Sequence, residues 1–139
     1  MTTINVVESK LREIDEYYSL LLKYREYSRE KIEEDFALKG SLERYLYLLC
    51  QAAMEAGEAL IAFKGFYRPG SYSDIFEILK AKEIIDFKMT QNLIKMTAFR
   101  NAIAHDYEKF DFGIAYQVLM VDMDDIKNFE LIIKKYLNL

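Results

Sequence analysis

The sequence predicts an all-α protein that folds as an up-and-down bundle of four to six helices. Apolar residues recur at alternating intervals of three and four over long stretches, which is the spacing of one face of an α-helix. The 139 residues include only one proline and five glycines, so few positions force a helix to end. The stretches between the periodic segments are short, as they are between antiparallel neighbours in a bundle.

The N-terminal half is predicted to form two long helices. The first covers about residues 5–27, and its apolar stripe consists of Ile4, Val7, Leu11, Ile14, Tyr18 and Leu21. The charged stretch SREKIEEDFALKG follows and ends at Gly40, which favours a helix stop or a connector there. A second helix is predicted over about residues 41–64. Its small residues Ala52, Ala53, Ala56 and Gly57 allow a neighbouring helix to approach closely.

Turn and cap signals divide the C-terminal half. The pair Pro69-Gly70 is the strongest turn signal in the chain. Ser71, with Asp74 three residues later, resembles a capping box for a short helix through Leu79. Three later aspartates precede apolar-periodic runs and are predicted to cap the remaining helices: Asp86, Asp111 and Asp122.

Composition indicates one soluble domain over residues 1–139. Hydrophobic residues make up 52% of the chain and charged residues 30%, which is the balance of a globular protein. A single cysteine, Cys50, cannot form an internal disulfide, so we expect a cytoplasmic location and a thiol packed in the core. The N-terminus lacks the pattern of a signal peptide, and the longest apolar stretch, residues 45–50, is too short to cross a bilayer. We therefore expect no membrane partner.

The charge is unevenly distributed along the chain. A net charge of −4 argues against a nucleic-acid binder. Residues 64–109, however, carry eight basic and six acidic side chains, so this segment is +2 and the remainder is −6. Because local fields attract phosphates, the total charge does not exclude a polyanionic ligand.

The segment AFRNAIAHDYEKF, residues 98–110, contains the only histidine of the chain. On a regular helix of about 100° per residue, His105 points about 140° away from Arg100, whereas Tyr107 returns to within about 20° of it. One helix therefore does not bring Arg100 and His105 onto one face. Either the helix ends near Ala104, or a second protomer completes the site.

These residues resemble a known family. AFRNAIAHDY fits the Arg-(four residues)-His-any-Tyr motif of the HEPN superfamily, and in particular of the HepT-type toxins of prokaryotic toxin–antitoxin pairs. The resemblance extends from Ser41 onward, through SLERYLYLLCQAAMEAGEALIA, SYSDIFEILKAKEIID and the C-terminal segment FDFGIAYQVLMVDMDDIKNFELIIKKYL. The N-terminal helix matches in character only.

The resemblance implies a homodimer whose two motifs face a shared cleft, and metal-independent cleavage of RNA. Arg100 and His105 would be the nuclease pair, with Asn101 as the polar residue that follows the arginine. The chemistry suits these residues, because a guanidinium holds two phosphate oxygens in a fork and an imidazole takes or gives a proton near neutral pH. The nucleophile is the ribose 2′-hydroxyl of the substrate, so neither a metal nor a cofactor is implied.

The resemblance also implies a partner and a means of neutralisation. HepT-type toxins are encoded beside a nucleotidyltransferase antitoxin, and the tyrosine of the motif, here Tyr107, receives AMP. The added bulk and negative charge beside Arg100 would repel an RNA backbone. Two lysines, Lys95 and Lys109, are weaker candidates for contacts with RNA phosphates.

The same residues suggest other functions. His105-Asp106 suggests a metal-dependent HD phosphohydrolase, but the chain has no second histidine to serve as a ligand. A di-iron carboxylate site requires paired Glu-x-x-His motifs, and residue 102 is an alanine. Two alternatives remain open: a non-catalytic module that binds a nucleotidyltransferase, and a helical dimerisation protein whose motif serves packing.

Overall fold

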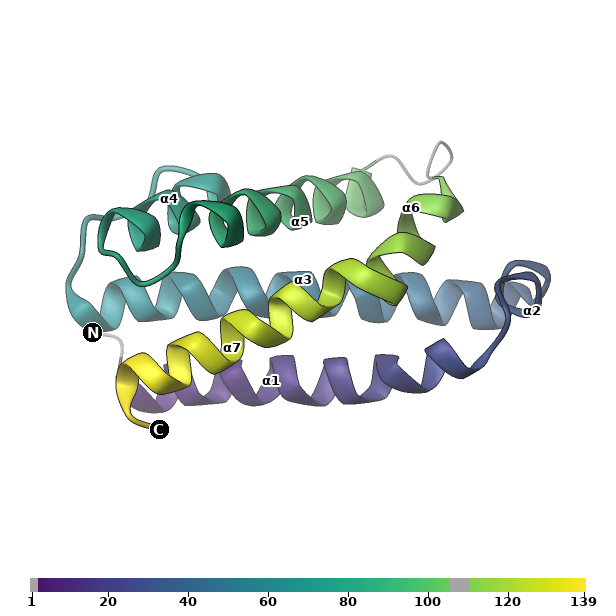
Figure 1. Ribbon diagram of the computed structural model, residues 1–139, viewed down its shortest axis with the longest axis horizontal. Helices are drawn as coiled ribbons and strands as arrows, with labels where there is room; N and C mark the ends of the chain where they lie inside the picture. The colour runs from purple at the N-terminus through teal and green to yellow at the C-terminus, as the bar shows by residue number, and fades with distance from the viewer. Residues whose placement is uncertain (1–2, 106–110) are drawn as a thin grey trace.

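The protein is a helical bundle with alternating helix directions (Figure 1). The structure, a computed structural model, describes residues 3–105 and 111–139, and these ranges contain helices but no strands. The bundle consists of α1 (Ile4–Leu22), α3 (Phe36–Lys64), α5 (Phe87–His105) and α7 (Met123–Leu137). Shorter elements connect them: the 3₁₀ helix η1 (Lys23–Glu26), α2 (Arg29–Glu34), α4 (Tyr72–Ala81), α6 (Phe112–Gln117) and the π-helical segment η3 (Val118–Asp122). The predicted all-α, up-and-down architecture is confirmed.

Helix α3 is the central element of the fold. It contacts α1 most extensively and also packs against α2, α4, α5 and α7. Figure 1 shows α1 on one side of α3, α4 and α5 on the other, and α7 crossing in front. Gly57 allows this close approach, because a Cβ built there would lie 2.6 Å from Cγ2 of Ile75 on α4 and 3.7 Å from the Phe129 ring on α7. The prediction that small residues of this helix admit a neighbour is confirmed at Gly57.

Helix α3 is long and apolar enough, by length and composition, to cross a membrane. In its most apolar 18-residue window, however, 61% of the residues are buried inside the protein. A helix that is hydrophobic nearly all round is found in the core of a bundle as well as in a bilayer. The packing of α3 against α1, α4, α5 and α7 explains its hydrophobicity here.

The predicted helix stop at Gly40 is wrong. Asp35 caps α3, with its side chain accepting a hydrogen bond from the Leu38 N–H at 3.1 Å, and the helix continues through Gly40. A glycine ends a helix readily only where it adopts the left-handed conformation, which Gly65 does with φ of 69° at the C-terminus of α3. Composition did not distinguish the two glycines, because the difference lies in the backbone angle.

Two of the predicted caps lead into the helices that carry the candidate site. The Ser71 Oγ accepts a hydrogen bond from the Asp74 N–H at 3.2 Å and so caps α4. The Asp74 carboxylate accepts instead from the Gly70 N–H at 2.9 Å, which fixes the preceding turn rather than closing a reciprocal box. Asp86 caps α5 as predicted, accepting from the Met89 N–H at 2.7 Å.

The last two helices are continuous in the structure. Asp111 caps α6 as predicted, but Asp122 is not a cap: its backbone is helical, and its side chain accepts no capping hydrogen bond. The chain passes from α6 to α7 through η3, a π-helical segment of the kind that bends a helix. Arg25 supports this segment by donating from Nε to the Leu119 carbonyl at 2.7 Å. The helix is thus continuous, and supported by a tertiary contact, where the spacing of the aspartates predicted a break between two helices.

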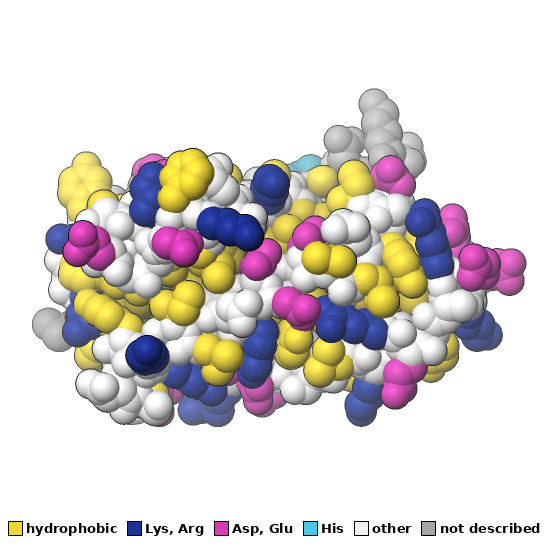
Figure 2. All heavy atoms as spheres, viewed as in Figure 1, with side chains coloured by type: hydrophobic (Ala, Val, Ile, Leu, Met, Phe, Trp, Pro, Cys, Tyr) yellow, Lys and Arg dark blue, Asp and Glu magenta, His cyan; other side chains and the backbone are white. Residues whose placement is uncertain are grey.

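Ion pairs join the helices that are distant in sequence. Asp124 accepts from the Tyr18 hydroxyl at 2.7 Å and from Arg25 Nη2 at 2.8 Å. Farther along α7, Glu130 is completely buried, and the Lys127 and Lys134 ammonium groups lie 2.8 Å from its two oxygens. Figure 2 shows basic and acidic side chains interspersed on this face of the molecule. The two lysines of α7 compensate the cost of burying the Glu130 carboxylate, and the contacts of Asp124 fix α7 against α1 and η1.

We expect Gly57→Ala to destabilise the protein and Gly40→Ala to stabilise it. The methyl group at 57 collides with Ile75 and costs about 1–3 kcal/mol as an overpacked contact. No atom lies within 4 Å of the corresponding Cβ at 40, so alanine contributes up to about 1 kcal/mol of helix propensity. Urea denaturation of both variants measures the difference, and equal shifts of the two midpoints would contradict this account of α3.

The contribution of Asp124 to stability should disappear in acid. Burial acts to raise the pKa of this carboxyl, but hydrogen bonds from Tyr18 and Arg25 and the charge of Arg25 outweigh it and lower the pKa. A lowered folded-state pKa contributes stability above the unfolded value of about 3.9, and that contribution is lost as the pH falls through the folded-state value. The free energy of unfolding of Asp124→Asn should therefore differ from that of the wild type more at pH 6 than at pH 2.5. A constant difference would contradict the shift.

Candidate functional site

Three helices position the guanidinium of Arg100. From α5, Nε donates to Oε1 of Gln51 on α3 at 2.9 Å, and Nη2 donates to the Tyr47 hydroxyl at 3.2 Å. The Arg100 Cζ also lies 5.1 Å from the centroid of the Tyr47 ring and 5.5 Å from that of Tyr72, at the start of α4. Cation–π attraction to two rings and two interhelical hydrogen bonds hold the charged group in one orientation.

Asn101 lies beside Arg100 and orients it. Its Oδ1 accepts a hydrogen bond from Arg100 Nη1 at 2.9 Å, and the side chain is otherwise exposed. A guanidinium has five N–H groups, and the described residues engage three of them, one on each nitrogen. With respect to the described residues, one N–H on each terminal nitrogen is left for a ligand, which is the fork that binds a phosphate.

His105 is exposed and is the last described residue of α5. Since α5 is helical from Phe87 to His105, the imidazole and Arg100 leave the helix axis in directions about 140° apart. The single chain therefore brings Arg100 and Asn101 together but does not bring His105 onto the same face. Lys95 is exposed on α5. Tyr107 and Lys109 lie outside the described residues.

The thiol of Cys50 lies on α3, next to Gln51 in the chain, and is buried. Burial raises the pKa of Cys50 to about 12, although the positive charge of Arg100 acts to lower it. The thiol therefore stays protonated at neutral pH and is not a nucleophile. The interpretation of Cys50 as a small core residue is confirmed.

Sequence reasoning missed the residues that hold Arg100, namely Tyr47, Gln51 and Tyr72. Gln51 was detectable from the sequence, because it is the only uncharged polar residue in the apolar run LLCQAAMEA. An amide in such a run indicates a specific hydrogen-bond partner. Tyr47 and Tyr72 gave no such signal, because eleven tyrosines are spread along the chain and most of them pack. Their role appears only when α3, α4 and α5 are placed side by side.

Comparison with known proteins identifies the family. The model of the HepT-like family, described as ribonuclease HepT-like, matches residues 14–131, which is most of the chain. The chain belongs to the HepT-like ribonuclease family. The predicted membership of the HepT-type family is thereby confirmed.

Two curated relatives resemble this HepT-like chain. The mRNA nuclease HepT of Shewanella oneidensis is 27% identical over 104 residues, which cover 75% of this chain and 78% of that protein. The putative RNase YutE of Bacillus subtilis is 28% identical over 97 residues, which cover 70% of this chain and 67% of that protein. Both alignments span two thirds or more of each partner, so the likeness extends well beyond the short motif.

Solved structures share the fold. A tri-AMPylated HEPN toxin of Shewanella oneidensis in complex with an MNT antitoxin has a TM-score of 0.85 and 24% identity, with 94% of this chain and 97% of that chain covered. YutE, described as a cytosolic protein of unknown function, has a TM-score of 0.79 and 23% identity, with coverage of 94% and 90%. At such identities the likeness establishes that the two proteins have the same arrangement of helices as this one.

Proposed function

We propose that the protein is the toxin of a toxin–antitoxin pair and acts as a metal-independent endoribonuclease. Arg100 binds the scissile phosphate, His105 transfers a proton, and Asn101 keeps the guanidinium in place. One observation supports the proposal most directly. Gln51 and Tyr47 fix the guanidinium of Arg100, and the described residues leave one N–H on each of its terminal nitrogens unengaged. The chain that carries this guanidinium belongs to the HepT-like ribonuclease family.

The reaction needs no nucleophile from the protein. The ribose 2′-oxygen attacks the adjacent phosphorus, the bond from phosphorus to the 5′-oxygen breaks, and the products end in a 2′,3′-cyclic phosphate and a 5′-hydroxyl. An imidazole can accept the 2′-hydroxyl proton and return a proton to the leaving oxygen, because it titrates close to neutral pH. The guanidinium stabilises the additional negative charge that the phosphate acquires in the transition state.

A homodimer resolves the orientation of the pair. The approximately 140° between Arg100 and His105 on α5 means that an imidazole facing the same phosphate as Arg100 comes most directly from a second copy of the chain. We therefore propose that the two motifs of a dimer face one cleft. The exposed position of His105 at the end of α5 is compatible with this arrangement.

We propose Tyr107 as the site of neutralisation by a partner nucleotidyltransferase. The phenolic oxygen attacks the α-phosphate of ATP held by the partner, a new phosphorus–oxygen bond forms, and pyrophosphate leaves. The relative that supports this proposal is the HEPN toxin described as tri-AMPylated and bound to an MNT antitoxin. We propose the cytoplasm as the location, since YutE is described as cytosolic, and keep Lys95 and Lys109 as proposed RNA contacts.

The wild-type protein should cleave RNA in the presence of EDTA, and His105→Ala and Arg100→Lys should each lower the rate by at least about 100-fold. Lysine keeps the positive charge of Arg100 but loses the fork. The rate is measured with end-labelled RNA, and the product ends identify the 2′-hydroxyl route. Arg12→Lys, an exposed arginine on α1, is the matched control and should cleave normally.

Three results would contradict the nuclease proposal. Full activity in a folded, dimeric His105→Ala would exclude the imidazole from proton transfer. Loss of cleavage in EDTA would indicate a metal-dependent reaction. A wild-type protein that binds a nucleotidyltransferase tightly but cleaves no RNA would be the non-catalytic module considered above.

Co-expression with the neighbouring nucleotidyltransferase should increase the mass of the protein by whole AMP units, and peptide mapping should assign them to Tyr107. The variant Tyr107→Phe lacks the acceptor oxygen and should stay unmodified. Tyr67→Phe serves as the control, because Tyr67 is 83% exposed and would be modified by a non-selective transfer. AMP found on Tyr67, or retained in Tyr107→Phe, would refute the assignment.

A further inference from the structure

Helix α3 leaves one polar stripe uncovered. The residues of this stripe recur at intervals of three and four and lie within about 80° of one another around the helix axis: Arg44, Tyr47, Gln51, Glu55 and Glu58. Arg44 and Glu58 are exposed, and the other three residues are half-buried. Gly57, on another side of α3, is covered by α4 and α7. The nuclease chemistry uses only Tyr47 and Gln51, as supports for Arg100, and does not explain the rest.

We propose that this stripe belongs to a binding track for single-stranded RNA. The track consists of an Arg–Tyr row, Arg44, Tyr47, Arg100 and Tyr72, and of a groove beside Pro69 at its end. It binds the nucleotides on either side of the phosphate at Arg100. The inference rests on the proposed ribonuclease function and adds to it the path of the substrate.

The Arg–Tyr row is continuous across three helices. The Arg44 Cζ lies 5.3 Å from the centroid of the Tyr47 ring, the Arg100 Cζ lies 5.1 Å from the same centroid, and the Tyr72 centroid is 5.5 Å from the Arg100 Cζ. Arginine and aromatic side chains therefore alternate from α3 to α5 to α4. Tyr47 is thus shared by two guanidinium groups, those of Arg44 and Arg100.

This alternation matches the chemistry of a single strand. Arginines bind successive phosphates, while aromatic rings stack on bases of any identity, so the two residue types together bind RNA without requiring a sequence. Arg44 is exposed on α3, and 39% of the Tyr72 surface is exposed. Both side chains are therefore accessible to solvent.

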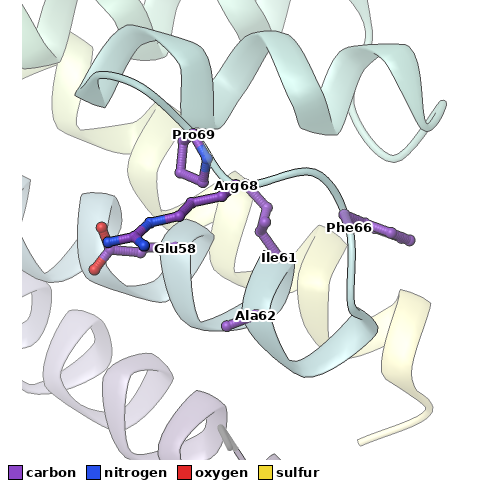
Figure 3. A pocket seen from close by; sticks show the side chains of 6 residues that line it. All are labelled: Glu58, Ile61, Ala62, Phe66, Arg68 and Pro69. Carbon is purple, nitrogen blue, oxygen red and sulfur yellow. The ribbon is translucent and has the colours of Figure 1, made fainter.

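The row leads into a groove at the start of α4. Tyr72 lines a cavity of about 270 Å³ together with Glu58, Pro69, Gly70 and Ser71. A second cavity of about 450 Å³ shares Glu58 and Pro69 with it and adds Arg68. Figure 3 shows the Arg68 guanidinium extending toward the Glu58 carboxylate, with Pro69 beside it. The combined groove offers a proline and a tyrosine to a base and a guanidinium to a phosphate.

One of the two glutamates of the stripe, Glu55, is paired with a cation, which weakens its repulsion of RNA. Glu55 lies 3.1 Å from the Lys10 ammonium of α1 and also accepts from Gln51 Nε2 at 3.4 Å. The Arg68 guanidinium extends toward Glu58 (Figure 3). Glu55 thus has a cation from another helix close to it, while Arg44 and Arg100 have no carboxylate partner among the described residues.

Helix α3 sets the length of the track. From Arg44 to Glu58 the helix advances fourteen residues, or about 21 Å at about 1.5 Å per residue. Stacked nucleotides advance about 3.4 Å each along one strand, so the track accommodates about six. Affinity should therefore rise with oligonucleotide length up to about six nucleotides and change little beyond that.

The test measures binding of a fluorescent single-stranded RNA by anisotropy in the His105→Ala background, which should not cleave it. Arg44→Gln should lower the affinity by at least about fivefold and reduce the slope of log affinity against log salt by about 0.7, as one lost phosphate contact does on a single strand. Tyr72→Ala should lower the affinity by at least about fivefold, and Tyr72→Phe should restore it, because the ring is what stacks. Arg12→Gln, on α1, should leave both quantities unchanged.

The outcomes separate this inference from the nuclease proposal. RNA binding that weakens in Arg44→Gln and Tyr72→Ala supports the track, even if the wild type fails to cleave. Affinities equal to that of Arg12→Gln overturn the track, even if the wild type cleaves. A wild type that binds no RNA overturns both. Light scattering is recorded on every variant. Loss of the dimer in Arg44→Gln would show that this surface is a contact between protein chains, and that result would also overturn the track.

Discussion

The placement of Arg100 depends on one requirement: a guanidinium that is half removed from water needs partners for its N–H groups. Gln51 and Tyr47 supply them from α3, and Tyr72 adds its ring from α4. These contacts connect the helix that carries the motif to the central helix of the bundle. A polar contact among apolar surfaces is specific in geometry, so it fixes the rotation of α5 as well as the direction of the side chain.

Burial of α3 makes this contact possible. Because α1, α4, α5 and α7 pack around it, α3 is apolar on most of its circumference, and Arg44, Gln51, Glu55 and Glu58 lie on the remaining stripe. The contacts of Asp124 with Arg25 and Tyr18 fix α7 against η1 and α1, and they involve none of the residues of the stripe beside Arg100. The contacts that fix α7 and the residues of the candidate site are thus different sets of residues in the same bundle.

The apolar periodicity and the cap signals of the sequence predicted much of this fold. They gave wrong helix boundaries where a tertiary contact or the backbone conformation determines whether the helix continues. Asp86 and Asp111 are caps because an aspartate before a helix can reach the first free N–H groups whatever surrounds it. Asp122 has the same local pattern but lies inside a helix that bends through a π-helical segment supported by Arg25. Gly40 likewise kept helical angles within α3, and Gly65 ended the helix instead.

The sequence by itself determined the class of fold, the motif from Arg100 to Tyr107 and the family, since each depends on residues that are close in the chain or on a pattern along it. Only the tertiary structure decided which residues surround the guanidinium. Tyr47 and Gln51 are about fifty positions from Arg100, and no spacing rule connects residues on different helices. Their contact depends on how α3 and α5 rotate against each other, which the packing of the whole core sets.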